Sequence, residues 1–154
     1  MKTQSPAMPK VQDRYFEDVQ VGDVIVPVVK KPDEVQLFCF SAVTWDTHRT
    51  HFDQPFSVNV DKLPGILVHG HLQGAFLGQL TTAWAGPKGR LLFLGYQNRG
   101  MSVPGDTLTC TGKATAKKED ADKGVVTCQV WVENQKGQMT TTGEAIIELP
   151  RRGK

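Results

Sequence analysis

The sequence has few cysteines and no long hydrophobic segment, and both shortages narrow the class of protein. Three cysteines, Cys39, Cys110 and Cys128, are widely spaced and odd in number, unlike the paired framework of a small secreted domain. No run approaches the roughly 18 apolar residues of a membrane span, and "MKTQSPAMPKVQD" at the N-terminus lacks the apolar core of a secretory signal. We therefore expect a cytoplasmic protein without a membrane span, with reduced cysteines that serve as packing residues.

Strong charge of either sign is also absent. The 18 Lys and Arg and 16 Asp and Glu residues give a formal net charge of +2, and the basic residues are scattered except for the terminal "RRGK". Because nucleic-acid binding needs a concentrated basic surface, no nucleic-acid partner is expected. The length predicts one domain over residues 13–150, with a flexible N-terminal tail over 1–12 and a basic C-terminal tail over 151–154.

The first half of the sequence contains one predicted strand and two predicted helices. Residues 24–29 form a β-branched run typical of a strand. Residues 33–44 have apolar side chains at helical spacing and follow Pro32, which is favoured at a helix start. Residues 52–67 show no steady period, which predicts an excursion over the surface. A longer helix is predicted to begin at Gly70 and to end before Gly86-Pro87.

The second half predicts a sheet that packs against this long helix. Alternating apolar and polar residues predict four antiparallel strands, which lie within residues 90–99, 105–118, 125–134 and 139–149. One long helix against one curled antiparallel sheet is an α+β two-layer domain. A hot-dog arrangement, in which the sheet wraps the helix, fits this order of elements.

Glycine recurs at every fourth position of the long helix, at Gly70, Gly74 and Gly78. Each glycine costs a helix about 1 kcal/mol relative to alanine. The repeat is explained if the helix backbone closely approaches a sheet, or a ligand at its N-terminus; chance glycines in a weak helix are the alternative. At a helix start, free amides and the helix dipole favour negative charge. The Gly70 amide is therefore a candidate donor to an oxygen that becomes negatively charged during a reaction.

All four histidines lie close together in the sequence, at His48, His51, His69 and His71. A carboxylate beside an imidazole, as in Asp46 and His51, can hold the tautomer of the ring and activate water. A zinc site is an alternative, because these histidines with Asp46 or Asp53 supply enough ligands. The absence of a nearby cysteine and the position of His69 and His71 at a helix start disfavour zinc. Chance clustering is the third possibility.

Four stretches, in this order, resemble the MaoC-like (R)-specific enoyl-CoA hydratases and 3-hydroxyacyl-thioester dehydratases. They are "YFEDVQVGD", "WDTHRTHFD", "GILVHGHLQGAFL" and "VPGDTLTCTGKA". The second is similar to the motif G-D-x-N-P-x-H-x-D, which places Asp46 and His51 on its catalytic aspartate and histidine. Trp45, His48 and Arg49 replace the glycine, asparagine and proline of that motif.

This resemblance implies a hot-dog fold and a hydro-lyase activity, the reversible hydration of trans-2-enoyl thioesters to (R)-3-hydroxyacyl thioesters. Asp46 and His51 would activate the water. The thioester carbonyl would be held by the Gly70 amide, with His69 and His48 as further substrate-binding residues. No metal and no separate cofactor is implied, because the acyl-CoA thioester substrate carries the coenzyme A.

The resemblance also implies a homodimer, because one sheet with one helix leaves an edge and a groove uncovered. A heteromer with a related hot-dog subunit is the alternative. Two other functions are considered. A hot-dog acyl-CoA thioesterase would more naturally carry its carboxylate on the long helix, where "HLQGAFLGQLTTAW" has none. A non-catalytic acyl-CoA-binding subunit is disfavoured by the presence of both Asp46 and His51.

Overall fold

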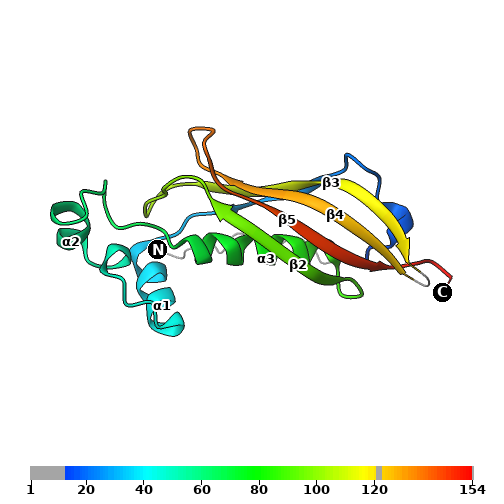
Figure 1. The fold of residues 1–154 in the computed structure, drawn as a ribbon, viewed down its shortest axis with the longest axis horizontal. Helices are drawn as coiled ribbons and strands as arrows, with labels where there is room; N and C mark the ends of the chain where they lie inside the picture. Colours follow the sequence, from blue (N-terminus) through cyan, green and yellow to red (C-terminus); the bar gives the residue numbers. More distant parts are fainter. Residues whose placement is uncertain (1–12, 121–122, 154) are drawn as a thin grey trace, which may run out of the picture.

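In the computed structural model, which describes residues 13–120 and 123–153, five strands form one antiparallel sheet on a long helix (Figure 1). The predicted tail over residues 1–12 lies outside this description. Two short 3-10 turns occur at Phe16–Asp18 and Arg49–His51. The helices and strands are, in chain order, β1 (Val24–Lys30), α1 (Glu34–Thr44), α2 (Gln54–Asn59), α3 (Gly70–Ala85), β2 (Arg90–Asn98), β3 (Leu108–Asp120), β4 (Lys123–Glu133) and β5 (Met139–Pro150).

The sheet has the strand order β1-β3-β4-β5-β2, and every neighbouring pair is antiparallel. Helix α3 runs along one face of this sheet, while α1 and α2 lie together at one end (Figure 1). This is the predicted hot-dog fold, a curled antiparallel sheet around one long central helix. Within the described ranges, no helix is both long enough and apolar enough to cross a membrane.

The core forms between α3 and the alternating inward side chains of the strands. Cys110 and Cys128 are fully buried on β3 and β4, where burial raises the pKa of their thiols to about 12 and about 11. Both are inert packing residues, as the sequence predicted. The same prediction is wrong for Cys39, which is exposed on α1.

Helix α1 buries its less apolar side. Asp33 caps its N-terminus by accepting a hydrogen bond from the Gln36 amide at 2.7 Å, as expected for a helix start. Leu37 and Ser41 are its buried residues. Val35 and Phe38, which belong to the apolar set at helical spacing, are 70% and 61% exposed. The spacing predicted the helix correctly but does not mark the face that packs against the protein.

One further expectation needs correction. The predicted surface excursion contains a regular element, α2, which begins after Asp53 accepts a hydrogen bond from the Phe56 amide. The start of the basic C-terminal tail forms ion pairs. Arg151 contacts Glu17 and Glu119, and Arg152 contacts Asp18, so this segment is tied to the first 3-10 turn and to β3.

The three glycines of α3 face alternate residues of β2, in the pairs Gly70–Asn98, Gly74–Tyr96 and Gly78–Leu94. A Cβ atom on Gly74 would overlap the Tyr96 ring, and one on Gly70 would overlap the Asn98 side-chain amide. A Cβ atom on Gly78 would lie 3.8 Å from Leu94, an ordinary contact. Close approach of the helix to the sheet therefore explains Gly70 and Gly74.

Candidate active site

Asp46 is positioned by the sharp end of α1. Trp45 has φ 56° and ψ 33°, in the left-handed region, and the Asp46 amide then donates to the Ser41 carbonyl at 2.9 Å. Glycine adopts this conformation most readily, and position 45 is where the motif described above has glycine. The Asp46 carboxylate accepts a hydrogen bond from the His48 amide at 3.1 Å, which closes the loop around it.

His51 lies beside Asp46 in a single, identifiable tautomer. Its Nδ1 lies 2.8 Å from the Leu67 carbonyl oxygen, and because a carbonyl only accepts, Nδ1 carries the proton. In the neutral ring Nε2 therefore keeps its lone pair, and it faces the Asp46 carboxylate with 3.8 Å between Nε2 and Oδ2. One water molecule can hydrogen-bond both atoms at ordinary lengths of about 2.8 Å. The arrangement is that of a base and an orienting carboxylate.

His69 supports the His51 ring from behind. The two imidazoles stack with centroids 3.8 Å apart and planes 19° apart, and His69 Nε2 lies 2.8 Å from the Ser41 hydroxyl. His69 is 1% exposed. Its burial, together with the charge of His51, lowers the pKa of its imidazole to about 4, against the opposing effect of Asp46. His69 is therefore uncharged near neutral pH.

The stack also brings the start of α3 to the site. His69 is the residue immediately before Gly70, the first residue of α3, and the first amides of a helix have no acceptor within the helix. The His48 ring approaches His51 edge-on, with centroids 5.8 Å apart. His71 is exposed and its Nδ1 lies 3.0 Å from the Tyr96 hydroxyl, so it does not join the stack.

A metal ion is the alternative occupant of this cluster. Asp46, His51 and His69 each offer one ligand atom, and these atoms lie within 4.8 Å of one another. Stacked rings in nearly parallel planes direct their lone pairs side by side, whereas a tetrahedral zinc site needs lone pairs that converge. A base with its orienting carboxylate fits this geometry better than a metal centre.

Some of this site was not predicted from the sequence. Ser41 and the Leu67 carbonyl fix the positions of His69 and His51, but neither stands out in the sequence. Ser41 belongs to an apolar helix, and a backbone carbonyl has no sequence signature. The only available signal for Ser41 was a polar residue four positions after Leu37, on the face of α1 that turns out to be buried.

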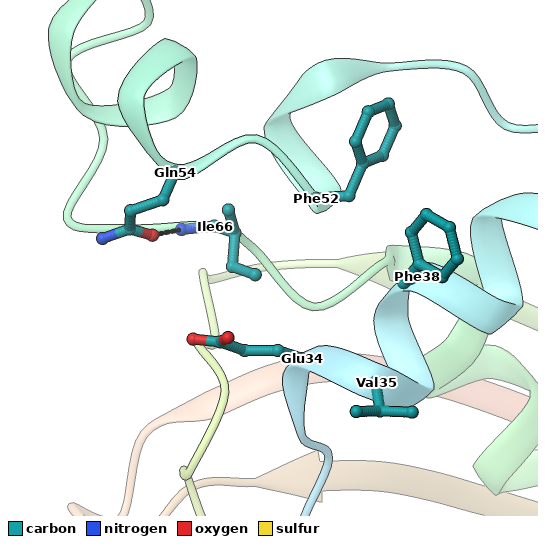
Figure 2. Close-up of a pocket in the computed structure, with 6 residues that line it drawn as sticks. All are labelled: Glu34, Val35, Phe38, Phe52, Gln54 and Ile66. Atoms are coloured by element: carbon teal, nitrogen blue, oxygen red, sulfur yellow. Dashed lines mark hydrogen bonds between the residues drawn. The ribbon is translucent and has the colours of Figure 1, made fainter.

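A cavity of about 310 Å³ is lined by the sequence neighbours of the cluster (Figure 2). Phe52, which follows His51, and Ile66, which precedes Leu67, form part of its wall, and Phe38 contributes from α1. The Gln54 side chain accepts a hydrogen bond from the Ile66 amide at 3.0 Å, which ties α2 to this wall (Figure 2). The lining is largely apolar, with the Glu34 carboxylate at its edge.

Comparison with known proteins identifies the family. The sequence model of the family described as hydroxyacyl-thioester dehydratase type 2 matches residues 17–103, a range that includes Asp46, His51 and Gly70. The chain belongs to this family. The resemblance to MaoC-like hydratases and dehydratases is thereby confirmed.

Two curated proteins that are similar to this chain are hydratases. Mesaconyl-C(4)-CoA hydratase of Chloroflexus aurantiacus is 37% identical over 75 residues, which are 49% of this chain and 26% of the relative. The chain thus matches about a quarter of the length of that relative. (R)-specific enoyl-CoA hydratase of Aeromonas caviae is 28% identical over 124 residues, which are 79% of this chain and 89% of the relative.

Solved structures show the same fold. An (R)-hydratase from A. caviae superimposes with a TM-score of 0.78 at 26% identity, covering 87% of this chain and 99% of that one. A chain of the ChsH1-ChsH2 complex from Mycobacterium tuberculosis superimposes with a TM-score of 0.74 at 22% identity, covering 84% of this chain and 98% of that one.

Proposed function

We propose that this chain catalyses the reversible hydration of trans-2-enoyl-CoA thioesters to (R)-3-hydroxyacyl-CoA thioesters. The observation that carries the proposal is the His51 tautomer: Nδ1 is held by the Leu67 carbonyl, and Nε2 is free to face Asp46 across 3.8 Å. Membership of a dehydratase family and similarity to hydratases support the reaction type.

The water would bind between the two side chains. His51 Nε2 accepts a proton from this water as the oxygen attacks the β carbon of the enoyl group. The Asp46 carboxylate orients the second hydrogen of the water and offsets the positive charge that forms on the imidazole. Because His69 behind His51 stays neutral, no second cation opposes that charge.

The electron pair of the double bond moves toward the thioester carbonyl, whose oxygen becomes enolate-like. The Gly70 amide at the start of α3 would donate a hydrogen bond to this oxygen, where the helix dipole also favours negative charge. The proton then returns to the α carbon, which completes the addition of one water. The reverse sequence dehydrates a 3-hydroxyacyl thioester. The side chains of His69 and His48 would contact the thioester group beside Gly70.

The cavity beside Phe52 is the proposed place for part of the acyl chain. Its volume of about 310 Å³ lies at the small end of ligand pockets, and its apolar wall suits a hydrocarbon. The substrate brings its own coenzyme A, and the proposed steps use only side chains and a backbone amide. We further propose that the working form is a homodimer, with a heteromer of related hot-dog subunits as the alternative.

A thioesterase is less well supported. Helix α3, Gly70–Ala85, contains no Asp or Glu, so the carboxylate that a hot-dog thioesterase would carry on this helix is missing. A non-catalytic acyl-CoA-binding subunit would not need the paired Asp46 and His51 in their present geometry.

The test follows the absorbance of the enoyl-thioester bond with crotonyl-CoA and with a longer trans-2-enoyl-CoA. Loss of absorbance, with (R)-3-hydroxyacyl-CoA identified by chiral chromatography, is the expected result. Release of free thiol instead would establish a thioesterase. Binding of both substrates without turnover would leave an acyl-CoA-binding subunit as the function.

A further inference from the structure

We propose that the side-chain amide of Asn98 is a second hydrogen-bond donor to the thioester carbonyl, beside the Gly70 amide. This inference rests on the proposed function, and it adds a catalytic residue that the motif does not contain. Asn98 is the last residue of β2, far in the sequence from Asp46 and His51.

The Asn98 amide occupies the space directly over Gly70. A Cβ atom built on Gly70 would lie 2.6 Å from Asn98 Cγ and would overlap Nδ2, while Oδ1 would be the farther atom at 3.0 Å. The nitrogen is therefore the Asn98 atom that faces the first residue of α3. Glycine at position 70 makes room for this amide as well as for a ligand.

A buried hydrogen-bond network contacts the oxygen end of the Asn98 amide. The Thr140 hydroxyl donates to Gln73 Oε1 at 2.6 Å, and the Thr141 hydroxyl lies within hydrogen-bond distance of two acceptors, Gln73 Oε1 at 3.0 Å and Asn98 Oδ1 at 3.1 Å. Gln73, Thr140 and Thr141 are all buried. In this arrangement Asn98 Oδ1 lies on the Thr141 side of the amide, and Nδ2 lies on the Gly70 side.

This orientation is the opposite of an ordinary helix cap. A side chain that caps a helix N-terminus presents an oxygen, because the unpaired groups there are N–H donors. Here the Asn98 atom nearest to Gly70 is a donor, Nδ2. A carbonyl oxygen that enters beside Gly70 would accept from the Gly70 amide and from Nδ2 together.

Two buried polar atoms without a hydrogen-bond partner lie on the segments that flank the Gly70–Asn98 contact. Within the described ranges, two buried side-chain atoms have no hydrogen-bond partner, His69 Nδ1 and Ser102 Oγ. His69 directly precedes Gly70. Ser102 lies on the segment after Asn98, and the Ser102 carbonyl accepts a hydrogen bond from the Val68 amide at 2.8 Å. The segments on both sides of the Gly70–Asn98 contact thus carry polar groups that the protein itself leaves unpaired.

The chemical consequence is a two-donor site for the oxygen that becomes enolate-like. The Gly70 amide and Asn98 Nδ2 would share the charge that develops as water attacks. Removing one such donor typically lowers kcat by about 10²–10³-fold. Because the charge develops in the transition state, the loss falls on kcat more than on KM.

The test compares Asn98→Asp and Asn98→Ala with Gln97→Glu in the enoyl-CoA hydration assay. Gln97 is the adjacent amide on β2, exposed to solvent, and serves as the matched control. Both Asn98 variants are expected to lose about 10²-fold in kcat with KM within about threefold, while Gln97→Glu stays within about twofold of wild type. Circular dichroism confirms that each variant is folded.

Wild-type kcat in Asn98→Ala would overturn the inference while leaving the proposed function intact. A higher Tm of Asn98→Asp, without loss of kcat, would show instead that residue 98 caps α3 with an oxygen. Absence of hydration by the wild-type protein would overturn the proposed function, and this inference with it.

Discussion

Two stacked imidazoles, those of His51 and His69, have different surroundings although they belong to the same cluster. His51 has a backbone carbonyl on one nitrogen and a carboxylate facing the other. His69 is enclosed, with the Ser41 hydroxyl on one nitrogen and no partner on the other. The two rings thus have separate tasks: one exchanges a proton with water, and the other is an uncharged surface that holds it in place.

The first prediction concerns His69 and pH. Its pKa in the folded protein is lowered to about 4 from 6.5, so as the pH decreases from 6.5 toward 4 the unfolded chain takes up a proton that the folded chain does not. The contribution of His69 to the free energy of unfolding is therefore complete above pH 6.5 and is lost as pH decreases toward 4. Between pH 7 and pH 5 the wild type should lose on the order of 2 kcal/mol more unfolding free energy than His69→Gln. Urea denaturation of both proteins at each pH measures the difference, and equal losses would contradict it.

At the residue scale, the sequence left three explanations for the histidine cluster, and the motif resemblance favoured Asp46 and His51 as a catalytic pair. The contacts that make His51 a base could not be predicted from the sequence. The Leu67 carbonyl is a backbone atom, and the Ser41–His69 contact joins residues that the fold brings together across 28 positions. Such contacts follow from tertiary structure and leave no local pattern.

Helix α3 shows what local pattern does predict at the scale of elements. Its start at Gly70 and its end before Gly86 match the expectation from the sequence. Its buried face is wider than the apolar period alone predicts, because it also includes the polar residues Gln73 and Thr81. The glycine repeat predicted a close approach without identifying the partner, which is β2. Helix α1 shows the converse, since its apolar positions at helical spacing are exposed and only the neighbouring elements decide which face is buried.

The second prediction compares two glycines of α3. At Gly74 a Cβ atom would overlap the Tyr96 ring, whereas at Gly78 it would meet Leu94 at 3.8 Å. Gly74→Ala should therefore destabilise the protein by about 1–3 kcal/mol through overpacking. Gly78→Ala should stabilise it by up to about 1 kcal/mol through helix propensity. Thermal unfolding of both variants decides, and equal shifts in Tm would show that β2 does not set the spacing.

At the scale of the whole molecule, the sheet has two edges, β1 and β2, with different capacity for further pairing. Strand β1 contains Pro27, which has no N–H to donate. Strand β2 contains no proline. Both edges expose apolar side chains, Val24 and Val26 on β1 by 65% and 69% and Leu92 and Phe93 on β2 by 44% and 50%. The proline therefore separates the two edges, and β2 is the edge through which a second hot-dog subunit is expected to join.

The third prediction is the mass of the protein in solution. Light scattering should give roughly twice the chain mass of 17.0 kDa. Leu92→Lys places a charge at the β2 edge and should lower the mass toward that of one chain. Val21→Lys, at an exposed position in the turn before β1, is the control and should leave the mass unchanged. A wild-type mass of 17.0 kDa at assay concentration would contradict the homodimer.

The central claim is that Asp46 and His51 act as one unit on a single water molecule. The most direct measurement is kcat for enoyl-CoA hydration by Asp46→Asn, His51→Gln and the double variant, with Asp33→Asn as a control that retains its helix cap. Each single variant should lose at least about 10²-fold. The double variant should be little slower than the worse single one, because either change alone disables the water. Near-wild-type turnover in Asp46→Asn or His51→Gln, or losses that multiply in the double variant, would contradict the account.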